Sequence, residues 1–183
     1  EITTRLVGSE MCIRDSAQTG KKVLLIDGDL RKASLSAFYG GKNTRGLVHL
    51  LMNPQASPDS VLQSGKRFPG FDLVTAGPVP PNPVALLTRG RLEELLRYWR
   101  ARYDRIILDG CPYEAVADAS LMARHADLVL YVIRCGMIEK QYVPAIQGLA
   151  DKGEFRSGAI ILNAENFKNS RFHYYNEYSE TDG

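Results

Sequence analysis

Short runs of consecutive apolar residues recur along the chain and predict buried strands. The first run, residues 23–26, reads Val-Leu-Leu-Ile; it follows two lysines and ends at Asp27. Apolar runs of similar length predict four more strands, at residues 71–75, 105–109, 127–133 and 159–162. Runs without polar alternation are typical of strands that are buried on both faces, as in parallel sheets.

Helical patterns separate these runs. The clearest covers residues 89–102, where apolar positions recur at i, i+3, i+4 and i+7, namely Leu92, Leu95, Leu96 and Trp99. We expect shorter helices at residues 31–38, 46–52, 119–125 and 143–150, and we assign Asp118 as the cap of the third of these four. Strands that alternate with helices predict an α/β fold: a doubly wound, mainly parallel sheet with helices on both faces.

Three segments depart from this alternation. Residues 77–83 form a proline-rich connector, which is stiff because proline fixes φ and removes a hydrogen-bond donor. Residues 1–16 form an atypical N-terminal segment, in which residues 2–7 could form a strand and Ser9 could open a short helix. Residues 166–183 are polar, have few side chains to bury and carry three tyrosines, so we expect a flexible tail; these are Tyr174, Tyr175 and Tyr178.

Composition narrows the class of protein. A chain of 183 residues fits one domain with a proper core, and a net charge of +2 is too small to indicate nucleic-acid binding. The three cysteines form no CxxC pair, which argues against a zinc site or a disulfide framework and suits a reducing compartment. No apolar run approaches the roughly 18 residues of a membrane helix, so we expect a cytoplasmic protein without a transmembrane segment.

Polar residues follow the predicted strands at the ends where α/β sheets bind ligands: Asp27, Asp29, Asp109, Arg134 and Asn163. Three carboxylates that converge there predict a metal–nucleotide site, in which they could hold hydrated Mg²⁺ or accept a proton from an attacking hydroxyl. Two simpler interpretations stay open. Asp27 could cap the next helix while Asp29 is solvated, and Arg134 could pair with Asp127 or with a backbone carbonyl.

Several motifs together resemble one family. Residues 23–31 resemble the second Walker motif (Walker A′) of bacterial tyrosine kinases, the BY-kinases of capsule and exopolysaccharide assembly. Ile106-Ile107-Leu108-Asp109 resembles their Walker B strand, and residues 77–83 resemble their Gly-Pro-x-Pro-Pro-Asn-Pro connector. The match covers about residues 17–178. The connector and the tyrosine tail separate this family from the related MinD/ParA-like ATPases.

The resemblance implies a P-loop NTPase-like kinase domain over residues 17–165 that uses ATP and Mg²⁺. It implies catalytic roles for Asp27, Asp29 and Asp109, with Mg²⁺ held by Asp27 and Asp109 partly through water. It also implies cofactor contacts by Arg31, Arg134 and Asn163, the last at the adenine. The expected phosphorylation targets are Tyr174, Tyr175 and Tyr178, reached in trans within a ring of subunits. The expected partner is a transmembrane polysaccharide co-polymerase that activates the kinase at the inner face of the plasma membrane.

The sequence departs from the family at its beginning. No Gly-Lys-Ser or Gly-Lys-Thr occurs anywhere, although the family has a strand, such a loop and a helix before the segment that begins near Ala17. We interpret residues 7–16 as foreign sequence that replaces them, and we expect impaired activity because this loop cradles the phosphates. Two alternatives stay open: a MinD/ParA-like ATPase, and a non-catalytic homologue that binds a membrane partner.

Overall fold

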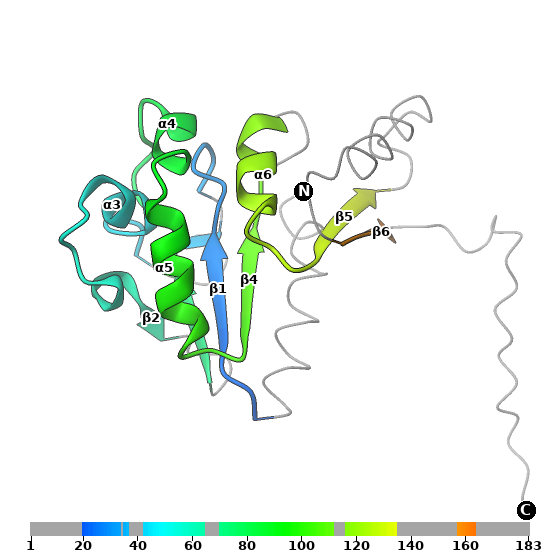
Figure 1. The fold of residues 1–183 in the computed structure, drawn as a ribbon, viewed down its shortest axis with the longest axis horizontal. Helices are drawn as coiled ribbons and strands as arrows, with labels where there is room; N and C mark the ends of the chain where they lie inside the picture. The colour runs from blue at the N-terminus through cyan, green and yellow to red at the C-terminus, as the bar shows by residue number, and fades with distance from the viewer. Residues whose placement is uncertain are drawn as a thin grey trace, which may run out of the picture.

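The computed structural model describes residues 20–33, 35–36, 42–64, 70–111, 116–134 and 157–163. The predictions for residues 1–16, for a helix at 143–150 and for the tyrosine tail lie outside these residues. Figure 1 shows strands that carry helices packed against them, which confirms an α/β fold with a mainly parallel sheet.

A four-stranded sheet forms the centre of the described fold, in the order β2-β3-β1-β4. Strand β1 (Val23–Asp27) pairs in parallel with β3 (Phe71–Val74) on one side and with β4 (Arg105–Asp109) on the other. All five β1 residues are buried, as their unbroken apolar run predicts. The short β2 (Gln63–Ser64) adds an antiparallel edge strand beside β3.

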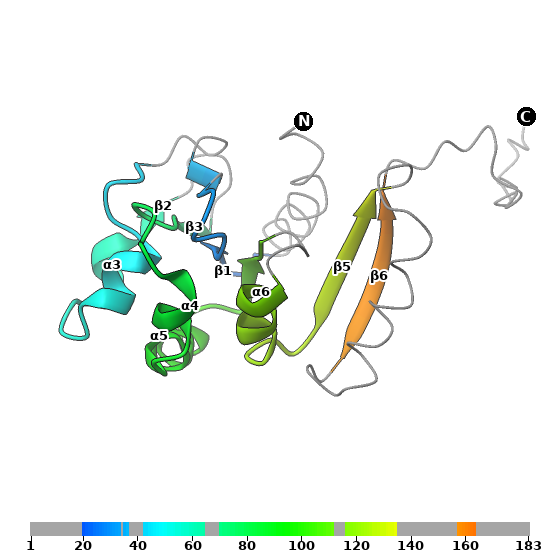
Figure 2. The ribbon, with the colours of Figure 1, turned by 90° about the horizontal axis from the view of Figure 1, so that it is seen from above.

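Helices pack against one face of this sheet and enclose the larger part of the core. They are α3 (Leu47–Met52), α4 (Pro83–Leu87), α5 (Arg91–Arg100) and α6 (Val116–Ala123), with a 3₁₀ turn, η1, at Pro58–Val61. Figure 2 shows α4, α5 and α6 on the same side of the strands. The predicted apolar stripe of α5 is buried against Leu24 and Ile26, which confirms its helical period. On the opposite face, Leu25 packs with Leu35 and Phe71.

Two further strands form a second sheet. Strand β5 (Val129–Arg134) pairs in parallel with β6 (Gly158–Asn163), and in the described part of the chain neither strand is hydrogen-bonded to β4. Figure 2 shows β5 and β6 lengthwise, whereas β1 and β4 are seen nearly end-on, so the two sheets are steeply inclined to each other. The described strands thus form two hydrogen-bonded sheets, of four and of two strands.

Three local predictions also differ from the structure. Residues 31–33 form a turn instead of the start of a helix, because Ala33 takes the left-handed conformation with φ 48°. The end of the connector starts a helix of its own, α4, with Pro83 in its first position. Asp118 lies inside the first turn of α6 instead of capping it, and its side chain bonds to Arg31.

Candidate functional site

Two carboxylates meet at the carboxyl ends of the central strands. Asp27 ends β1 and Asp109 ends β4, and they are register partners in the parallel pair. Partners in adjacent strands lie about 5 Å apart and project to the same face. The backbone N–H of Gly28 donates to the carbonyl of Asp109 at 2.8 Å, which continues the ladder by one bond. The sequence prediction that these two strand ends converge is therefore confirmed.

Asp27 is fully buried and is held by backbone donors. Its Oδ1 accepts a hydrogen bond from the N–H of Asp29 and its Oδ2 accepts one from the N–H of Leu35, both at 3.2 Å. Burial, together with repulsion from the Asp109 carboxylate, raises the pKa of Asp27 to about 6. The carboxyl group thus binds protons at near-neutral pH, and a nearby cation would favour its ionised form.

Asp29 shapes the loop that follows β1. Its Oδ1 accepts from the backbone N–H groups of Arg31 at 3.1 Å and Lys32 at 3.0 Å, and the residue is only 3% exposed. Asp29 therefore caps the turn that it begins. The interpretation of Asp29 as a solvated side chain is therefore wrong. The alternative role of Asp27 as a cap has some support, because its side chain accepts from the N–H of Leu35, where the next helical residues begin.

Gly28 stands between these two aspartates because no side chain fits there. A Cβ atom at this position would lie 2.6 Å from the Sδ of Met122 and 2.9 Å from the carbonyl oxygen of Asp109. Both approaches are closer than carbon can tolerate, and the second is to backbone. The Asp-Gly-Asp sequence therefore brings the loop close to β4 and α6, and it keeps Asp27 and Asp109 adjacent.

Arg31 leaves this loop and forms an ion pair with α6. Its Nε donates to Asp118 Oδ2 at 2.7 Å and its Nη2 donates to Asp118 Oδ1 at 3.3 Å. The hydrogen bond to Asp118 raises the pKa of Arg31, so the guanidinium stays charged. Asp118 was not among the predicted site residues, because the sequence gives no sign that positions 87 residues apart meet.

The other predicted cofactor residues lie in the second sheet. Arg134 and Asn163 end β5 and β6 and are register partners, so the structure brings them together. The three carboxylates belong to the four-stranded sheet or to the loop that follows β1. The residues expected to line one crevice therefore fall into two groups, one on each sheet. The adenine and phosphate roles of Asn163 and Arg134 stay predictions, and the tail tyrosines lie outside the described residues.

The donor set decides whether Mg²⁺ fits. Among the described residues no group of three or more His, Cys, Asp or Glu side chains could enclose a metal ion. Mg²⁺ usually keeps several waters and is bound by one or two carboxylates together with substrate phosphates. The register partners Asp27 and Asp109 suit that mode of binding, because a cation bound near them would offset the repulsion that helps to raise the pKa of Asp27.

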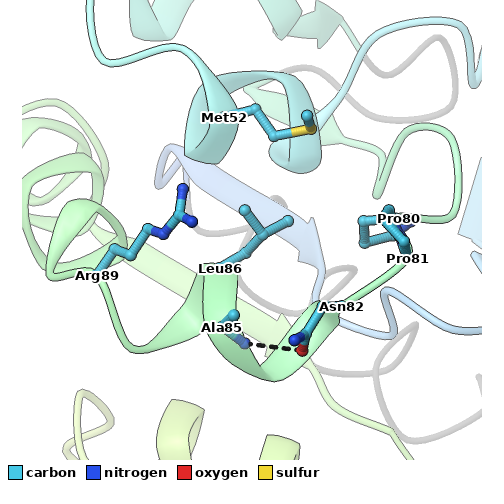
Figure 3. Close-up of a pocket in the computed structure, with 7 residues that line it drawn as sticks. All are labelled: Met52, Pro80, Pro81, Asn82, Ala85, Leu86 and Arg89. Atoms are coloured by element: carbon cyan, nitrogen blue, oxygen red, sulfur yellow. Dashed lines mark hydrogen bonds between the residues drawn. The ribbon is translucent and has the colours of Figure 1, made fainter.

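A separate cavity of about 270 Å³ lies between α3 and α4. Met52, Leu86 and the connector prolines line it, and Arg89 lies at its edge (Figure 3). Its lining includes none of the predicted site residues.

No described helix is long and apolar enough to cross a membrane.

No protein-family profile matches the chain. Individual proteins of known family do match it. Tyrosine-protein kinase YwqD of Bacillus subtilis is 39% identical over 160 residues, which span 87% of this chain and 67% of YwqD. Putative tyrosine-protein kinase CapB of Staphylococcus aureus is 33% identical over 160 residues, or 87% of this chain and 69% of CapB. The chain spans a smaller part, 20%, of tyrosine-protein kinase etk of Escherichia coli.

Solved structures agree. The kinase domain of Escherichia coli ETK superimposes with a TM-score of 0.75 at 32% identity, covering 87% of this chain and 63% of that domain. The septum site-determining protein MinD of Pyrococcus horikoshii has a TM-score of 0.65 at 20% identity, which indicates a shared fold alone. With this identity and coverage, the chain belongs to the bacterial tyrosine-protein kinases and has their P-loop NTPase-like α/β fold.

Proposed function

We propose that the site at the carboxyl ends of β1 and β4 serves an ATP-dependent protein-tyrosine kinase. The observation that carries this proposal is the register pair of Asp27 and Asp109, next to the loop shaped by Asp29. Phosphoryl transfer depends mainly on positioning and on charge neutralisation by a metal ion, and paired carboxylates beside a phosphate site would hold that ion. The named relatives favour this function over that of a MinD-like ATPase.

The residues divide the work as follows. Asp109 would hold the hydrated Mg²⁺, and Asp27 would accept the proton of the tyrosine hydroxyl or join the metal shell. A pKa of about 6 suits a base, because the group is mostly ionised at neutral pH and still binds a proton. When bound, Mg²⁺ and ATP supply the transferable phosphoryl group and neutralise its charge. Asp29 keeps the loop in place through its bonds to Arg31 and Lys32.

The proposed targets are the tail tyrosines of a neighbouring copy of the chain: Tyr174, Tyr175 and Tyr178. Three tyrosines within five residues stand next to acidic residues in a segment without a burial pattern. Each added phosphate would increase the negative charge of that segment. The names of the relatives, which include CapB and a kinase of a cps region, support a role in capsular or exopolysaccharide synthesis and export.

The proposed setting is the cytoplasmic side of the membrane, with a transmembrane co-polymerase as the activating partner. One solved relative, a chimerical protein named CapA2B2, has a TM-score of 0.73. Its name joins two Cap designations, which supports a kinase that works with a second protein. Assembly of the chain into a ring, with each tail reaching the next subunit, belongs to the same proposal.

We further infer that the 183-residue chain phosphorylates weakly, because it contains no Gly-Lys-Ser or Gly-Lys-Thr. The backbone cradle, the lysine and the hydroxyl of that loop are what hold the phosphates in P-loop proteins. This observation also favours a second candidate function: a non-catalytic homologue that binds a membrane partner through its surface or tail.

The test compares this chain with a version that carries a family Gly-Lys-Ser loop and helix before Ala17. Calorimetry measures Mg·ATP binding, and a phosphotyrosine antibody measures tail phosphorylation. We expect binding and phosphorylation by the restored version, much weaker signals from the chain itself, and loss of phosphorylation after Asp109→Asn. A restored version that binds Mg·ATP without phosphorylating tyrosine would contradict the kinase proposal. Equal binding by both versions would contradict the inferred impairment.

A further inference from the structure

One contact near the site is not explained by the proposed roles. The ion pair between Arg31 and Asp118 joins the loop after β1 to the first turn of α6. We propose that Asp118 is a positioning residue that holds the Arg31 guanidinium ready to bind a phosphate group of the nucleotide. This inference rests on the proposed function and adds to it a residue outside the Walker-like segments.

The geometry fixes the guanidinium in both position and plane. Asp118 accepts from Nε and from Nη2, so the side chain is held by two bonds in the planar fork that favours carboxylates. The backbone of the same residue is held by Asp29, whose Oδ1 accepts from the Arg31 N–H at 3.1 Å. Arg31 is therefore restrained at both ends, and it loses little further freedom when it binds an anion.

The burial of the two partners is unequal. The Asp118 side chain is only 4% exposed, whereas that of Arg31 is 49% exposed. Here the buried carboxylate acts as a fixed support, and the guanidinium presents its remaining N–H groups to solvent. None of the described contacts of Arg31 uses Nη1, so that nitrogen can donate to a phosphate.

The charges around the loop explain why a fixed cation is needed. Asp27, Asp29 and Asp109 place negative charge where a polyphosphate is proposed to bind. A mobile arginine would be drawn to these carboxylates, and it would lose the orientation that a phosphate requires. Pairing with Asp118 from the neighbouring helix keeps the guanidinium in one orientation, so that it faces the ligand with a defined set of donors.

The test uses inorganic pyrophosphate and the full 183-residue chain, so that it does not depend on kinase activity. The first readout is the ¹⁵N–¹H signal of Arg31 Nε, assigned by its loss in Arg31→Lys. We expect a protected, slowly exchanging signal in the original chain, its collapse in Asp118→Asn and its partial recovery in Asp118→Glu. Asp59→Asn, which breaks the exposed pair with Arg102, is the matched control and leaves the signal unchanged.

The second readout is pyrophosphate affinity by calorimetry. We expect Arg31→Lys and Asp118→Asn each to weaken binding about tenfold, and the double variant to bind no more weakly than Arg31→Lys alone, because both changes remove one interaction. Asp118→Glu preserves most of the affinity, and thermal unfolding checks that each variant is folded. If Asp118→Asn misfolds, Asp118→Glu decides: the inference requires this variant to keep most of the affinity together with a partly recovered Nε signal, and a lost Nε signal with unchanged affinity would overturn it.

Three results would overturn the inference: affinity that is unchanged or tighter in Asp118→Asn, additive losses in the double variant, or no pyrophosphate binding by the original chain. Tighter binding would make Asp118 a latch that withholds Arg31. The proposed function fails by a different result, the absence of tyrosine phosphorylation in the version with the restored loop. A chain that binds pyrophosphate through Arg31 and Asp118 without any such phosphorylation would keep this inference and reject the kinase.

Discussion

At the scale of single residues, the raised pKa of Asp27 makes the free energy of unfolding depend on pH. Burial raises its pKa to about 6 from an ordinary 3.8. Between these values the folded chain keeps a proton that the unfolded chain has lost, so the free energy of unfolding falls as pH rises through this window. At 1.36 kcal/mol per pKa unit the total fall is about 3 kcal/mol, and it is complete above the folded pKa.

We therefore expect the original chain to lose stability between pH 4 and pH 6 relative to Asp27→Asn, which has no proton to release. Urea unfolding of both proteins across this range measures the difference at each pH. Comparing slopes removes any constant effect of the amide on the two backbone hydrogen bonds. Parallel stability curves for the two proteins would mean that Asp27 titrates normally.

Gly46 offers a second test at this scale, because the space around it is closed. A Cβ atom there would lie 2.1 Å from the carbonyl oxygen of Thr75 and 2.5 Å from the nitrogen of Gly77. Both neighbours are backbone atoms of the segment after β3, so Gly46→Ala must displace either α3 or that segment. We expect a loss of about 3 kcal/mol in urea unfolding.

The matched control is Gly110→Ala, since nothing lies within 4 Å of a Cβ atom at that position. We expect a change within about 0.5 kcal/mol there. Similar stability losses in both variants would indicate that the alanine methyl group, and not the closed space at Gly46, determines the effect.

At the scale of elements, α4 depends on a single cap. The side chain of Asn82 accepts a hydrogen bond from the N–H of Ala85 at 3.2 Å (Figure 3). Pro83 occupies the first helical position. We expect Asn82→Ala to cost about 1 kcal/mol in thermal unfolding, and Asn82→Asp to preserve stability because it keeps the acceptor. Equal losses in both variants would show that Asn82 acts through packing at the adjoining cavity.

Some of these elements could be predicted from the sequence and others could not. Strands β1 and β4 follow from apolar runs that end in aspartate, and α5 follows from its apolar stripe, because burial imposes these patterns directly. The turn at residues 31–33 could not be predicted in this way. It depends on the Asp29 cap and on a left-handed Ala33, an unusual conformation for a residue with a Cβ atom.

The same contrast holds for the site. Asp27, Asp29 and Asp109 could be found because each ends a recognisable strand or lies two residues beyond one, and parallel strands bring such ends together. Asp118 could not, since its role depends on where α6 packs against the loop. Sequence patterns report burial along one segment, whereas a contact between distant segments needs the tertiary structure.

At the scale of the whole molecule, the second sheet is less well covered than the first. Leu128, Leu130 and Val132 around β5 are 55%, 43% and 46% exposed, and Leu162 of β6 is 60% exposed. Strands with apolar runs of this kind are normally buried on both faces. We call the group of Leu130, Val132 and Ile161 the β5–β6 patch, because their positions alternate onto one face of this sheet.

Exposed apolar strands favour association and dye binding, so the β5–β6 patch predicts both. We expect the double variant Leu130→Thr and Val132→Thr to bind less of a hydrophobic dye and to remain monomeric at higher concentration. Threonine keeps β-propensity, so its thermal midpoint should change little. Leu25→Thr is the control: because Leu25 in β1 is fully buried, this substitution should lower the thermal midpoint strongly without reducing dye binding.

A large loss of stability in the double variant would instead show that the patch is covered in solution, either by another part of the chain or by a second copy. Dye fluorescence, sedimentation and thermal unfolding on the same samples distinguish these cases, because a covered patch binds no dye before the substitutions and unfolds earlier after them.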